Sequence, residues 1–326
     1  RMAFDSYRTQ HARAYASDGE AERRFAAFKL NLALIDALND ANPLALFEGI
    51  SSKVKGPNIS KSQFGWITEE DCAACGMYPE LGNYTLANMP TEFDWRAKYE
   101  TPVSSQGYCG SCWSFSTAGD IEGKWFLATG QVVELSKQQL VACDQKRNAA
   151  EGCNGGLPYA AMQYVASTGG LVYEEDYPYK NVCAWGTCGS APKGTPTCDT
   201  DQVRGSLKDS AVAHIGGWQM VALGAQYEDL LATAMVKNGP ISIVLNAVGM
   251  EYYKAGAIDT TLPCEPTTLD HAVLVVGFGE QDGVEYWVVK NSWGSWWGEG
   301  GYYRVVKGQN HCGLANFAVT SVIKDP

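Results

Sequence analysis

The chain has 326 residues, of which 45% are hydrophobic and 19% are charged. This composition supports a sizeable buried core and excludes general disorder, and the length is enough for about two domains. Asp and Glu outnumber Lys and Arg by 36 to 25, so the net charge is −11. An acidic chain without a basic stripe is not expected to bind nucleic acid or an anionic membrane surface, and no apolar run of the sequence is long enough to span a bilayer.

A spaced stripe of residues predicts a helix in the N-terminal region. Its members recur at steps of three and four, which keeps them on one helix face. They are Glu20, Arg24, Phe28, Asn31, Ile35 and Asn39. By periodicity alone this is an ordinary amphipathic helix, and Asn42-Pro43 is expected to end it. Residues 50–90 are rich in Gly and Pro, which predicts an extended connection and a domain boundary.

The rest of the chain divides into a helical half and a β half. Helical patterns cover residues 111–128, 136–143 and 158–167. Strands are predicted over 240–245, 271–278, 284–290 and 300–306, and the turn at Gln281-Asp-Gly283 joins the second and third of them into a hairpin.

Eleven cysteines predict disulfides and therefore a secretory, lysosomal or extracellular compartment. The odd number leaves one thiol unpaired, and such a thiol is a candidate for reactivity. Two sequons, at Asn58 and Asn83, are expected glycosylation sites in the same compartment. The chain opens at Arg1-Met2 without a charged and then apolar leader, so we expect a signal peptide to have been removed or to lie outside this sequence.

The segment Cys109-Gly-Ser-Cys112-Trp carries the strongest chemical signal. A Cys-x-x-Cys pair can be a redox pair, half of a zinc site, or a structural cysteine beside a catalytic one. No second Cys or His pair at comparable spacing follows, and the approach over residues 101–107 is turn-rich rather than a strand. At the start of the predicted 111–128 helix, a Cys112 thiolate would be stabilised by the helix dipole, as a sulfur nucleophile requires.

A base for this nucleophile is found among four histidines. His271 directly precedes the apolar run that ends at Val276, and a histidine there is more often structural. The predicted hairpin, however, brings Asn291 back beside His271, where the amide oxygen would hold the imidazole in the tautomer that pairs with a thiolate. Gln106 would join the backbone N–H of Cys112 as an oxyanion donor.

With these motifs in this order, the chain resembles a zymogen of the papain family of cysteine proteases, on the cathepsin L side, over essentially its whole length. The resemblance implies an α+β fold of two lobes, one helical and one β-barrel-like, with a cleft between them. It implies an inhibitory propeptide over residues 1–88, whose signature is the stripe of residues 20–39, and a mature peptidase domain over 89–326. The catalytic residues would be Cys112, His271, Asn291 and Gln106.

The resemblance also implies how the substrate is held. Gly155 and Gly156 would line the cleft, and Trp293 would shield the His–Asn pair. Leu157, Pro158, Val244, Ala272 and Phe317 would line the S2 pocket. An aromatic floor without a carboxylate disfavours Arg at the P2 position of the substrate and favours Val or Leu.

The disulfides implied by the resemblance are Cys109–Cys153 and Cys264–Cys312. Cys143 would pair with Cys183, Cys188 or Cys198, and Cys198 is preferred, which leaves Cys183–Cys188 as a small loop. Cys72–Cys75 would be a local pair in the propeptide, with a bond from one of them to the mature domain as the rival. Cys112 then stays free, in agreement with its catalytic assignment.

Two stretches depart from the family pattern. The interval between Cys112 and His271 is longer than the roughly 130–150 residues that are typical. We expect the excess to be a surface loop within residues 181–226. The second propeptide motif of the family has Gly, Asn, Phe and Asp at alternate positions, and the matching stretch Ser60–Trp66 retains only Phe64, so the family's Asp is missing here.

The activity that follows is peptide-bond hydrolysis by a thiolate–imidazolium pair in mildly acidic, reducing conditions, with no cofactor and no metal. The expected partners are protein and peptide substrates, the chain's own propeptide and cystatin-like inhibitors, and a monomer is expected in a lysosome-like or extracellular location. Two alternatives remain: a catalytically silent binding protein, and a thiol–disulfide oxidoreductase, which requires Cys109 to be free when reduced.

Overall fold

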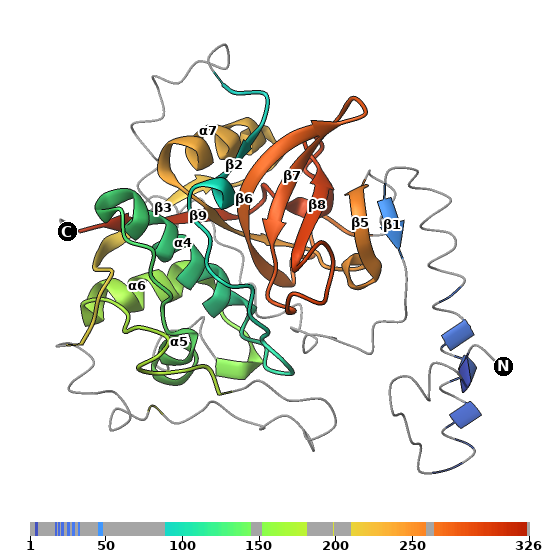
Figure 1. Cartoon of the computed structure of the whole chain (residues 1–326), viewed down its shortest axis with the longest axis horizontal. Coiled ribbons are helices and arrows are strands. Elements are labelled where there is room, and N and C mark those ends of the chain that lie inside the picture. Colours follow the sequence, from blue (N-terminus) through green and yellow to red (C-terminus); the bar gives the residue numbers. More distant parts are fainter. Residues whose placement is uncertain are drawn as a thin grey trace.

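The computed structural model describes residues 89–144, 152–180, 210–258 and 264–324, together with Cys198 and scattered residues among the first 47. These residues have the expected α+β fold, with α4, α5 and α6 in one lobe and the sheet, together with α7, in the other (Figure 1). No helix in this part of the chain has the length and apolar character needed to cross a membrane.

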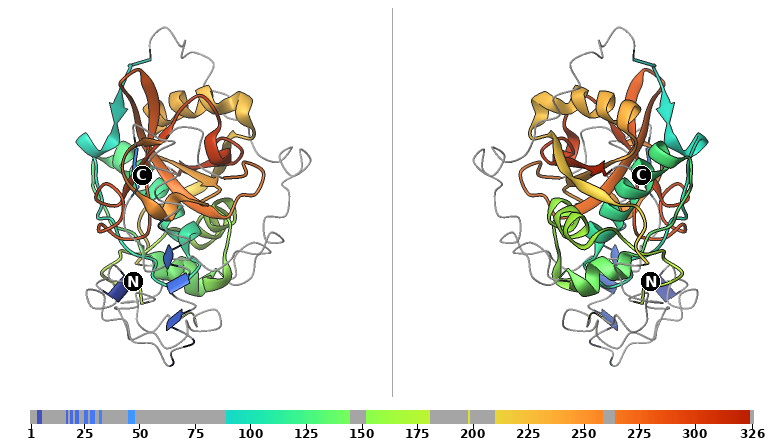
Figure 2. Two further views of the ribbon diagram at one scale, coloured as in Figure 1. Left: turned by 90° about the vertical axis from the view of Figure 1, so that its right-hand side faces the viewer. Right: turned by 90° about the vertical axis from the view of Figure 1, so that its left-hand side faces the viewer.

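The helical lobe contains α4 (Cys112–Thr129), α5 (Lys137–Cys143) and α6 (Pro158–Thr168), close to the predicted ranges. Helix α4 ends at Gly130, which has a left-handed φ of 74°, and α6 has Pro158 in its first turn. Both are residue types that local backbone geometry favours at those positions. Helix α7 (Glu228–Asn238) lies at the opposite end of the molecule from α5 and α6 (Figures 1 and 2).

The strands form one sheet in the order β1-β5-β8-β7-β6-β4-β9-β3, with β2 paired to β6. The pairs are antiparallel except for the parallel pair β5–β8. Their bounds are β1 Ala45–Phe47, β2 Phe93–Asp94, β3 Ile215–Ala222, β4 Ile241–Leu245, β5 Tyr253–Ile258, β6 His271–Gln281, β7 Val284–Lys290, β8 Tyr302–Val306 and β9 Ala318–Ile323. Short 3₁₀ turns cover Trp95–Ala97, Gly152–Asn154, Ala225–Tyr227, Met250–Tyr252 and His311–Gly313.

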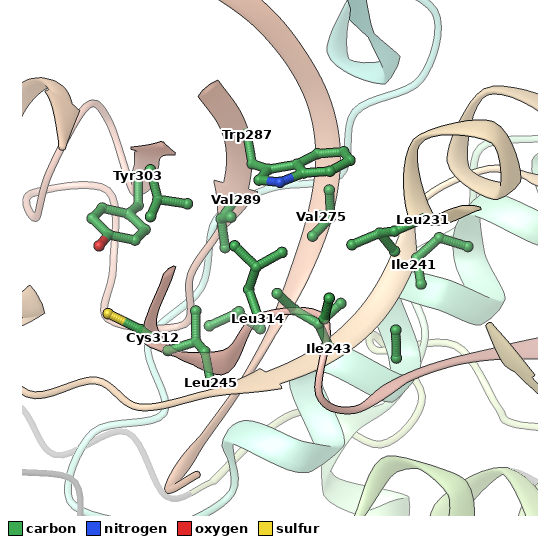
Figure 3. Packing of buried hydrophobic residues seen from close by; sticks show 14 of the residues in the cluster. Leu231, Ile241, Ile243, Leu245, Val275, Trp287, Val289, Tyr303, Cys312 and Leu314 are labelled. Atoms are coloured by element: carbon green, nitrogen blue, oxygen red, sulfur yellow. The ribbon is translucent and has the colours of Figure 1, made fainter. Parts of the chain in front are cut away.

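The core of the β lobe fills the space between the sheet and α7 (Figure 3). Trp287 on β7 is fully buried, and its indole N–H donates to Glu228 Oε1 at 2.8 Å, so a polar atom in this core is satisfied. Leu231 on α7 and Ile241 and Ile243 on β4 belong to the same cluster. The apolar runs read as strands in the sequence are therefore buried on the core side of this lobe.

The surface-loop expectation for residues 181–226 is wrong for 215–222. These residues form β3, which pairs with β9 and has half of its residues buried. The Gly216-Gly217 pair and two irregular steps in the strand register hide the alternation that would have indicated a strand. Residues 181–197 and 199–209 lie outside the described residues.

Helix α4 packs closely on the β lobe because two glycines face it. A Cβ on Gly119 would lie 2.8 Å from Leu274 Cδ2, and a Cβ on Gly123 would lie 2.6 Å from Pro240 Cδ. Between these glycines and Cys112, Ser116 donates to Val273 O at 2.7 Å. These contacts fix the position of α4 relative to β6, and thereby the position of Cys112 at the start of α4.

The N-terminal region is joined to the β lobe by a strand pair. Strand β1 lies antiparallel to β5, with Ala45 opposite Gly256. Farther toward the N-terminus, the rings of Phe4 and Phe28 meet edge to face at 5.2 Å. Phe28 is the one member of the predicted stripe among the described residues, and it is buried as a stripe residue should be. Glu20, Arg24, Asn31, Ile35 and Asn39 lie outside the described residues, as do Asn58, Asn83, Cys72 and Cys75.

Candidate active site

Cys112 is the first residue of α4 and is 2% exposed. It is the free cysteine of the described part of the chain. The backbone N–H of Ala272 donates to its sulfur at 3.5 Å, so the thiol lies against the start of β6, next to His271. The helix N-terminus and this N–H both favour negative charge on the sulfur.

His271 and Asn291 come together because they occupy neighbouring ends of the β6–β7 hairpin. Leu274 is paired with Lys290, which places Asn291 beside the first residues of β6. His271 Nε2 lies 2.8 Å from Asn291 Oδ1, and the same oxygen accepts from the Ser292 N–H at 2.8 Å. An amide oxygen can only accept, so Nε2 carries the proton and Nδ1 is left as the acceptor. The hairpin argument from the sequence predicted this contact.

Two tryptophans cover this pair. The Trp293 indole stacks on the His271 ring with centroids 4.9 Å apart, and Trp297 meets Trp293 edge to face at 5.0 Å. Both indoles are buried. A hydrogen bond held away from water in this way is electrostatically stronger than one in solvent.

Gln106 is held in a defined orientation beside the nucleophile. Its side-chain Oε1 accepts from Ser292 Oγ at 2.6 Å, and its Nε2 donates to Cys109 O at 2.9 Å. The amide nitrogen has two N–H groups, so one more donor remains in this arrangement. Ser292 thus connects the predicted oxyanion donor to Asn291, and sequence reasoning did not identify it because nothing in the pattern marks this serine.

Burial opposes charge on both Cys112 and His271 in the full-length chain. Burial raises the pKa of the Cys112 thiol to about 11, and the hydrogen bond from the Ala272 N–H partly opposes this shift. Burial also lowers the pKa of His271 to about 4, and the hydrogen bond to Asn291 partly opposes this shift. Burial in the full-length chain therefore opposes the charged form of each residue, and so opposes the ion pair expected for the working enzyme.

The loop that precedes α6 lies on the first turn of α4. A Cβ on Gly156 would lie 2.6 Å from the Trp113 ring, so only glycine fits against this fully buried indole. Trp113 in turn donates to Gly152 O at 3.2 Å. Gly155 and Leu157 flank Gly156 in this loop, and Pro158 is the first residue of α6; all three are buried.

Three residues of the predicted S2 pocket share one apolar cluster with Cys112. Val244 is paired with Ala272 across β4 and β6, and the Val244 N–H donates to Phe317 O at 2.9 Å. Phe317 is 7% exposed, and its ring lies 6.2 Å from that of Tyr159. Tyr159, from the first turn of α6, was not predicted at this pocket because its place depends on how α6 packs.

The described disulfides are Cys109–Cys153, Cys143–Cys198 and Cys264–Cys312, which are the pairs that the family resemblance implied. The bond between Cys109 and Cys153 speaks against an oxidoreductase that uses Cys109 with Cys112, because Cys109 already has another partner. Cys183 and Cys188 lie outside the described residues.

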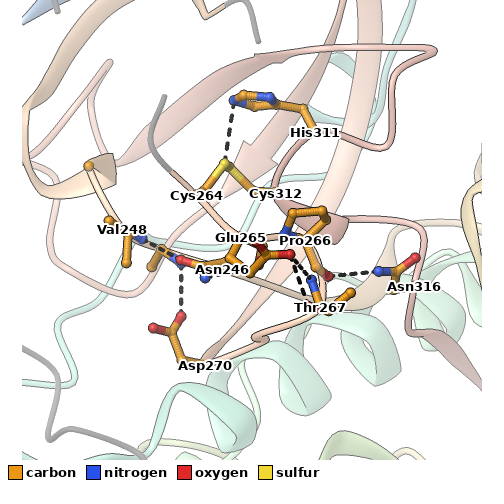
Figure 4. Close-up of a disulfide and its surroundings, with 12 residues drawn as sticks. Asn246, Val248, Cys264, Glu265, Pro266, Thr267, Asp270, His311, Cys312 and Asn316 are labelled. Carbon is orange, nitrogen blue, oxygen red and sulfur yellow. Dashed lines mark hydrogen bonds between the residues drawn. A yellow bond between two sulfur atoms is a disulfide. The ribbon is translucent and has the colours of Figure 1, made fainter. Parts of the chain in front are cut away.

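The Cys264–Cys312 bond anchors the segment that leads to His271 (Figure 4). Asn316 Nδ2 donates to Pro266 O at 2.7 Å, and the Ala247 N–H donates to Asp270 Oδ1 at 2.8 Å. His311 Nε2 lies 3.8 Å from Cys264 Sγ. These three residues, Cys264, His311 and Cys312, are a group with metal-ligand spacing, but the two sulfurs are bonded to each other and offer no thiolate to an ion.

A small pocket beside Asn291 is lined by a network of polar and charged side chains that includes Thr101, Glu122 and Lys290. Lys290 Nζ donates to Thr101 Oγ1 at 2.9 Å, and Thr101 Oγ1 donates to Glu122 Oε2 at 2.8 Å. Lys137 Nζ lies 3.9 Å from Glu122 Oε1 and 2.8 Å from Glu134 Oε1. Burial lowers the pKa of Lys290. Because these residues come from separate segments, the sequence did not indicate that they meet.

Comparisons with known proteins agree with this geometry. Residues 89–322 match the papain family cysteine protease model, and residues 4–56 match the cathepsin propeptide inhibitor domain. The chain is 37% identical to cysteine proteinase 15A of Pisum sativum over 97% of this chain and 85% of that protein. It is similar to the structure of digestive procathepsin L2 from Tenebrio molitor, with a TM-score of 0.79, 28% identity and 99% of each chain covered. For digestive procathepsin L 3 of the same insect, the TM-score is 0.72 and the identity 31%, over 99% of this chain and 98% of that one.

A buried free cysteine at a helix start, a histidine bonded to an asparagine, and a matching propeptide domain thus occur together in one chain. The chain belongs to the papain family of cysteine proteases and is a zymogen with an inhibitory propeptide domain ahead of its peptidase domain.

Proposed function

We propose that this protein is an endopeptidase in which Cys112 is the nucleophile, His271 the acid and base, Asn291 the residue that orients His271, and Gln106 an oxyanion donor. The observation that carries the proposal is the bond of 2.8 Å between His271 Nε2 and Asn291 Oδ1, beside a free thiol that accepts from the Ala272 N–H. This is the arrangement that activates a sulfur nucleophile: a base within reach, oriented by a third group.

The reaction starts with proton transfer from the Cys112 thiol to His271 Nδ1. The thiolate attacks the scissile carbonyl, and the second Gln106 N–H and the Cys112 N–H bind the oxygen that becomes negative. His271 then gives its proton to the leaving amine, and a thioester remains on Cys112. Water, deprotonated by His271, hydrolyses the thioester and restores the thiol.

The proposed pocket selects an aliphatic residue at P2. Val244, Ala272 and Phe317 present apolar surface, and the Phe317 ring closes the floor against Tyr159. A pocket without a carboxylate gives a buried guanidinium no partner, so Arg at P2 is disfavoured. Val and Leu fill such a pocket with apolar contact alone.

The proposed propeptide covers residues 1–88 and is removed by cleavage near residues 85–90. Cys112 and His271 are both buried in the full-length chain, which prevents access by substrate. Acid favours an opened site because an exposed His271 takes up a proton near its ordinary pKa of 6.5, whereas the buried imidazole does so only at about 4.

We place the enzyme in an acidic, lysosome-like compartment or outside the cell, as a monomer that cystatin-like proteins inhibit. The described disulfides support passage through the secretory pathway, where such bonds form.

The test is acidification of the purified full-length chain from pH 7 to about pH 4 with a mild reductant. We expect a fragment of about 26 kDa, at roughly 110 Da per residue and the size of one domain. Activity on fluorogenic peptides with Leu or Val at P2, and little on the peptide with Arg, is expected to rise with this fragment.

The matched controls are Cys112→Ala, which removes the nucleophile, and Cys143→Ala with Cys198→Ala, which removes two other cysteines. Only Cys112→Ala, or a thiol-directed epoxide, should abolish the activity outright. Activity that persists in Cys112→Ala would contradict the proposal. An intact and silent wild-type chain would be treated with a trace of active protease, and silence after that cleavage would also contradict it.

A further inference from the structure

The disulfide between Cys264 and Cys312 has a histidine beside it that the proposed chemistry does not use. His311 Nε2 lies 3.8 Å from Cys264 Sγ (Figure 4). A ring nitrogen of this histidine and the two sulfurs all lie within 4.8 Å of one another. In the oxidised chain the sulfurs are bonded to each other, so these three residues can act together on a ligand only after the disulfide has opened.

Two thiolates and an imidazole are ligands that Zn²⁺ prefers. Zn–S bonds of about 2.3 Å and Zn–N bonds of about 2.0–2.1 Å place tetrahedral ligand atoms roughly 3.5–4 Å apart. The distance of 3.8 Å between His311 Nε2 and Cys264 Sγ is already in this range. After the bond opens, rotation of the partly exposed Cys264 side chain moves its sulfur away from that of Cys312 and makes room for the ion.

The two segments that carry the cysteines are held together by hydrogen bonds as well as by the disulfide. The Asn246 N–H donates to Cys312 O at 2.9 Å, and Asn246 Nδ2 donates to Glu265 O at 3.0 Å. Asn316 Nδ2 donates to Pro266 O at 2.7 Å (Figure 4). These bonds do not involve sulfur, so they keep both thiols near His311 when the disulfide is reduced.

The turn that presents His311 and Cys312 is fixed by its own contacts. Asn310 and Cys312 have left-handed φ values of 48° and 53°, which are uncommon for residues other than glycine. The Asn310 N–H donates to Glu228 Oε2 at 2.6 Å, and the Ala315 N–H donates to Asn310 Oδ1 at 2.9 Å. Backbone of this kind, held by its surroundings in a sparsely populated conformation, is found at ligand-binding sites.

Reduction can start at Cys264, because its side chain is partly exposed whereas Cys312 is 3% exposed and belongs to the β-lobe core (Figure 3). The thiolate of a dithiol reductant attacks Cys264 Sγ, the disulfide breaks, and Cys312 leaves as a thiolate. The second thiol of the reductant then closes the reductant's own disulfide and releases Cys264. The reductant is thereby oxidised by two electrons, and Zn²⁺ displaces the protons that the freed thiols carry.

We propose that Cys264, Cys312 and His311 form a Zn²⁺ site when a dithiol opens this disulfide, with water as the fourth ligand. The ion then joins the same two segments that the disulfide joins, so the segment leading to His271 stays anchored under reducing conditions. This site is separate from the proposed peptidase chemistry, and its test needs no activity.

The test uses the full-length chain with Cys112→Ala, which removes the proposed nucleophile as a competing ligand. The chain is treated at neutral pH with the dithiol dose at which mass mapping finds Cys264 and Cys312 open and Cys109–Cys153 and Cys143–Cys198 closed. The dithiol is removed by gel filtration without oxygen. Titration against a chromophoric chelator should then find one Zn²⁺ bound per reduced chain and none per oxidised chain, and Co²⁺ should give the charge-transfer absorption of thiolate ligands.

His311→Ala keeps every thiol and should lower the Zn²⁺ affinity of the reduced chain at least about tenfold, since even the loss of a residue that only supports a ligand has such an effect. His311→Gln, which keeps a polar side chain, guards against a folding defect and should lose affinity in the same way. The matched control is His214→Ala, because His214 lies beside Gly169 O and not in this cluster.

Three results would overturn the proposal. The first is equal Zn²⁺ affinity in the His311 variants and the His214 variant, which would place the ion elsewhere. The second is equal binding by the oxidised and reduced chains, which would exclude the two thiolates as ligands. The third is a disulfide that opens only when the chain unfolds, because the folded protein would then never present this ligand set.

Discussion

Gln106 offers the sharpest test at the scale of a single residue. One of its N–H groups donates to Cys109 O, and its oxygen accepts from Ser292 Oγ, so the amide is oriented before any substrate arrives. Preorganised donors of this kind stabilise the charge that develops in the transition state. We predict that Gln106→Ala lowers kcat by about 100-fold to 1,000-fold with little change in KM, as measured in steady-state assays of the activated enzyme.

A suitable control for this variant is Gln138→Ala. Gln138 is also buried, and its Oε1 accepts from the Lys180 N–H at 3.0 Å, but this bond lies away from Cys112. Both variants lose a buried amide, and both should lose about 1–3 kcal/mol of stability. If kcat fell equally in the two, Gln106 would be a structural residue and not an oxyanion donor.

At this scale the sequence predicted the residues that the chemistry needs but not those that hold them in place. The hairpin turn and the order of His271 and Asn291 were sufficient to bring these two side chains together. Ser292 and Lys290 could not be assigned in the same way, because their roles depend on which segments pack beside them. That packing is set by long-range contacts for which a single sequence carries no local signal.

At the scale of an element, the packing of the loop before α6 against the first turn of α4 can be tested. Gly156 has no left-handed φ, yet a Cβ on it would lie 2.6 Å from the Trp113 ring. Trp113 is fully buried and cannot move aside without disturbing the first turn of α4, which holds Cys112. We predict that Gly156→Ala lowers the free energy of unfolding by about 1–3 kcal/mol and lowers kcat as well, as measured by denaturant unfolding and by activity.

Gly216→Ala is the matched control, since it also adds one methyl group to a glycine. At Gly216 the nearest atom to a new Cβ is Lys324 Cβ, at the ordinary contact distance of 3.8 Å. This variant should be close to neutral in both measurements. Equal behaviour of the two variants would show that backbone entropy, and not the contact with Trp113, governs the effect.

The elements themselves were predicted where the periodicity was regular. Helices α4, α5 and α6 and the β6–β7 hairpin match their expected ranges within a few residues, because each has a clear apolar pattern. Gly or Pro marks an end of α4 and α6 and the turn of the hairpin, and Ser136 caps the start of α5. Strand β3 has the pattern Ile-Gly-Gly-Trp, which shows neither period, and β9 and α7 were not assigned. Strands β9 and β3 form one end of the sheet, so the lobe as a whole could be expected only from the family resemblance.

At the scale of the whole molecule, we predict that the stability of the closed chain, the full-length chain with His271 buried, depends on pH. Burial holds the pKa of His271 at about 4, below the ordinary 6.5. Between these pH values an unfolded or opened chain binds a proton at His271 that the closed chain does not bind. The contribution of this residue to the stability of the closed chain is thus intact above about pH 6.5 and falls as the pH drops toward 4.

The prediction is tested in the background of Cys112→Ser, which cannot process itself. Its free energy of unfolding is measured by denaturant titration at pH 7 and pH 4.5, with and without His271→Gln. The chain that keeps His271 should lose about 2 kcal/mol more on acidification than the chain that carries His271→Gln, by linkage between a pKa of about 4 and one of 6.5. The carboxylates titrate in both chains and cancel in the comparison. Identical losses would mean that carboxylates alone open the zymogen, and that the buried imidazole has no part in sensing acid.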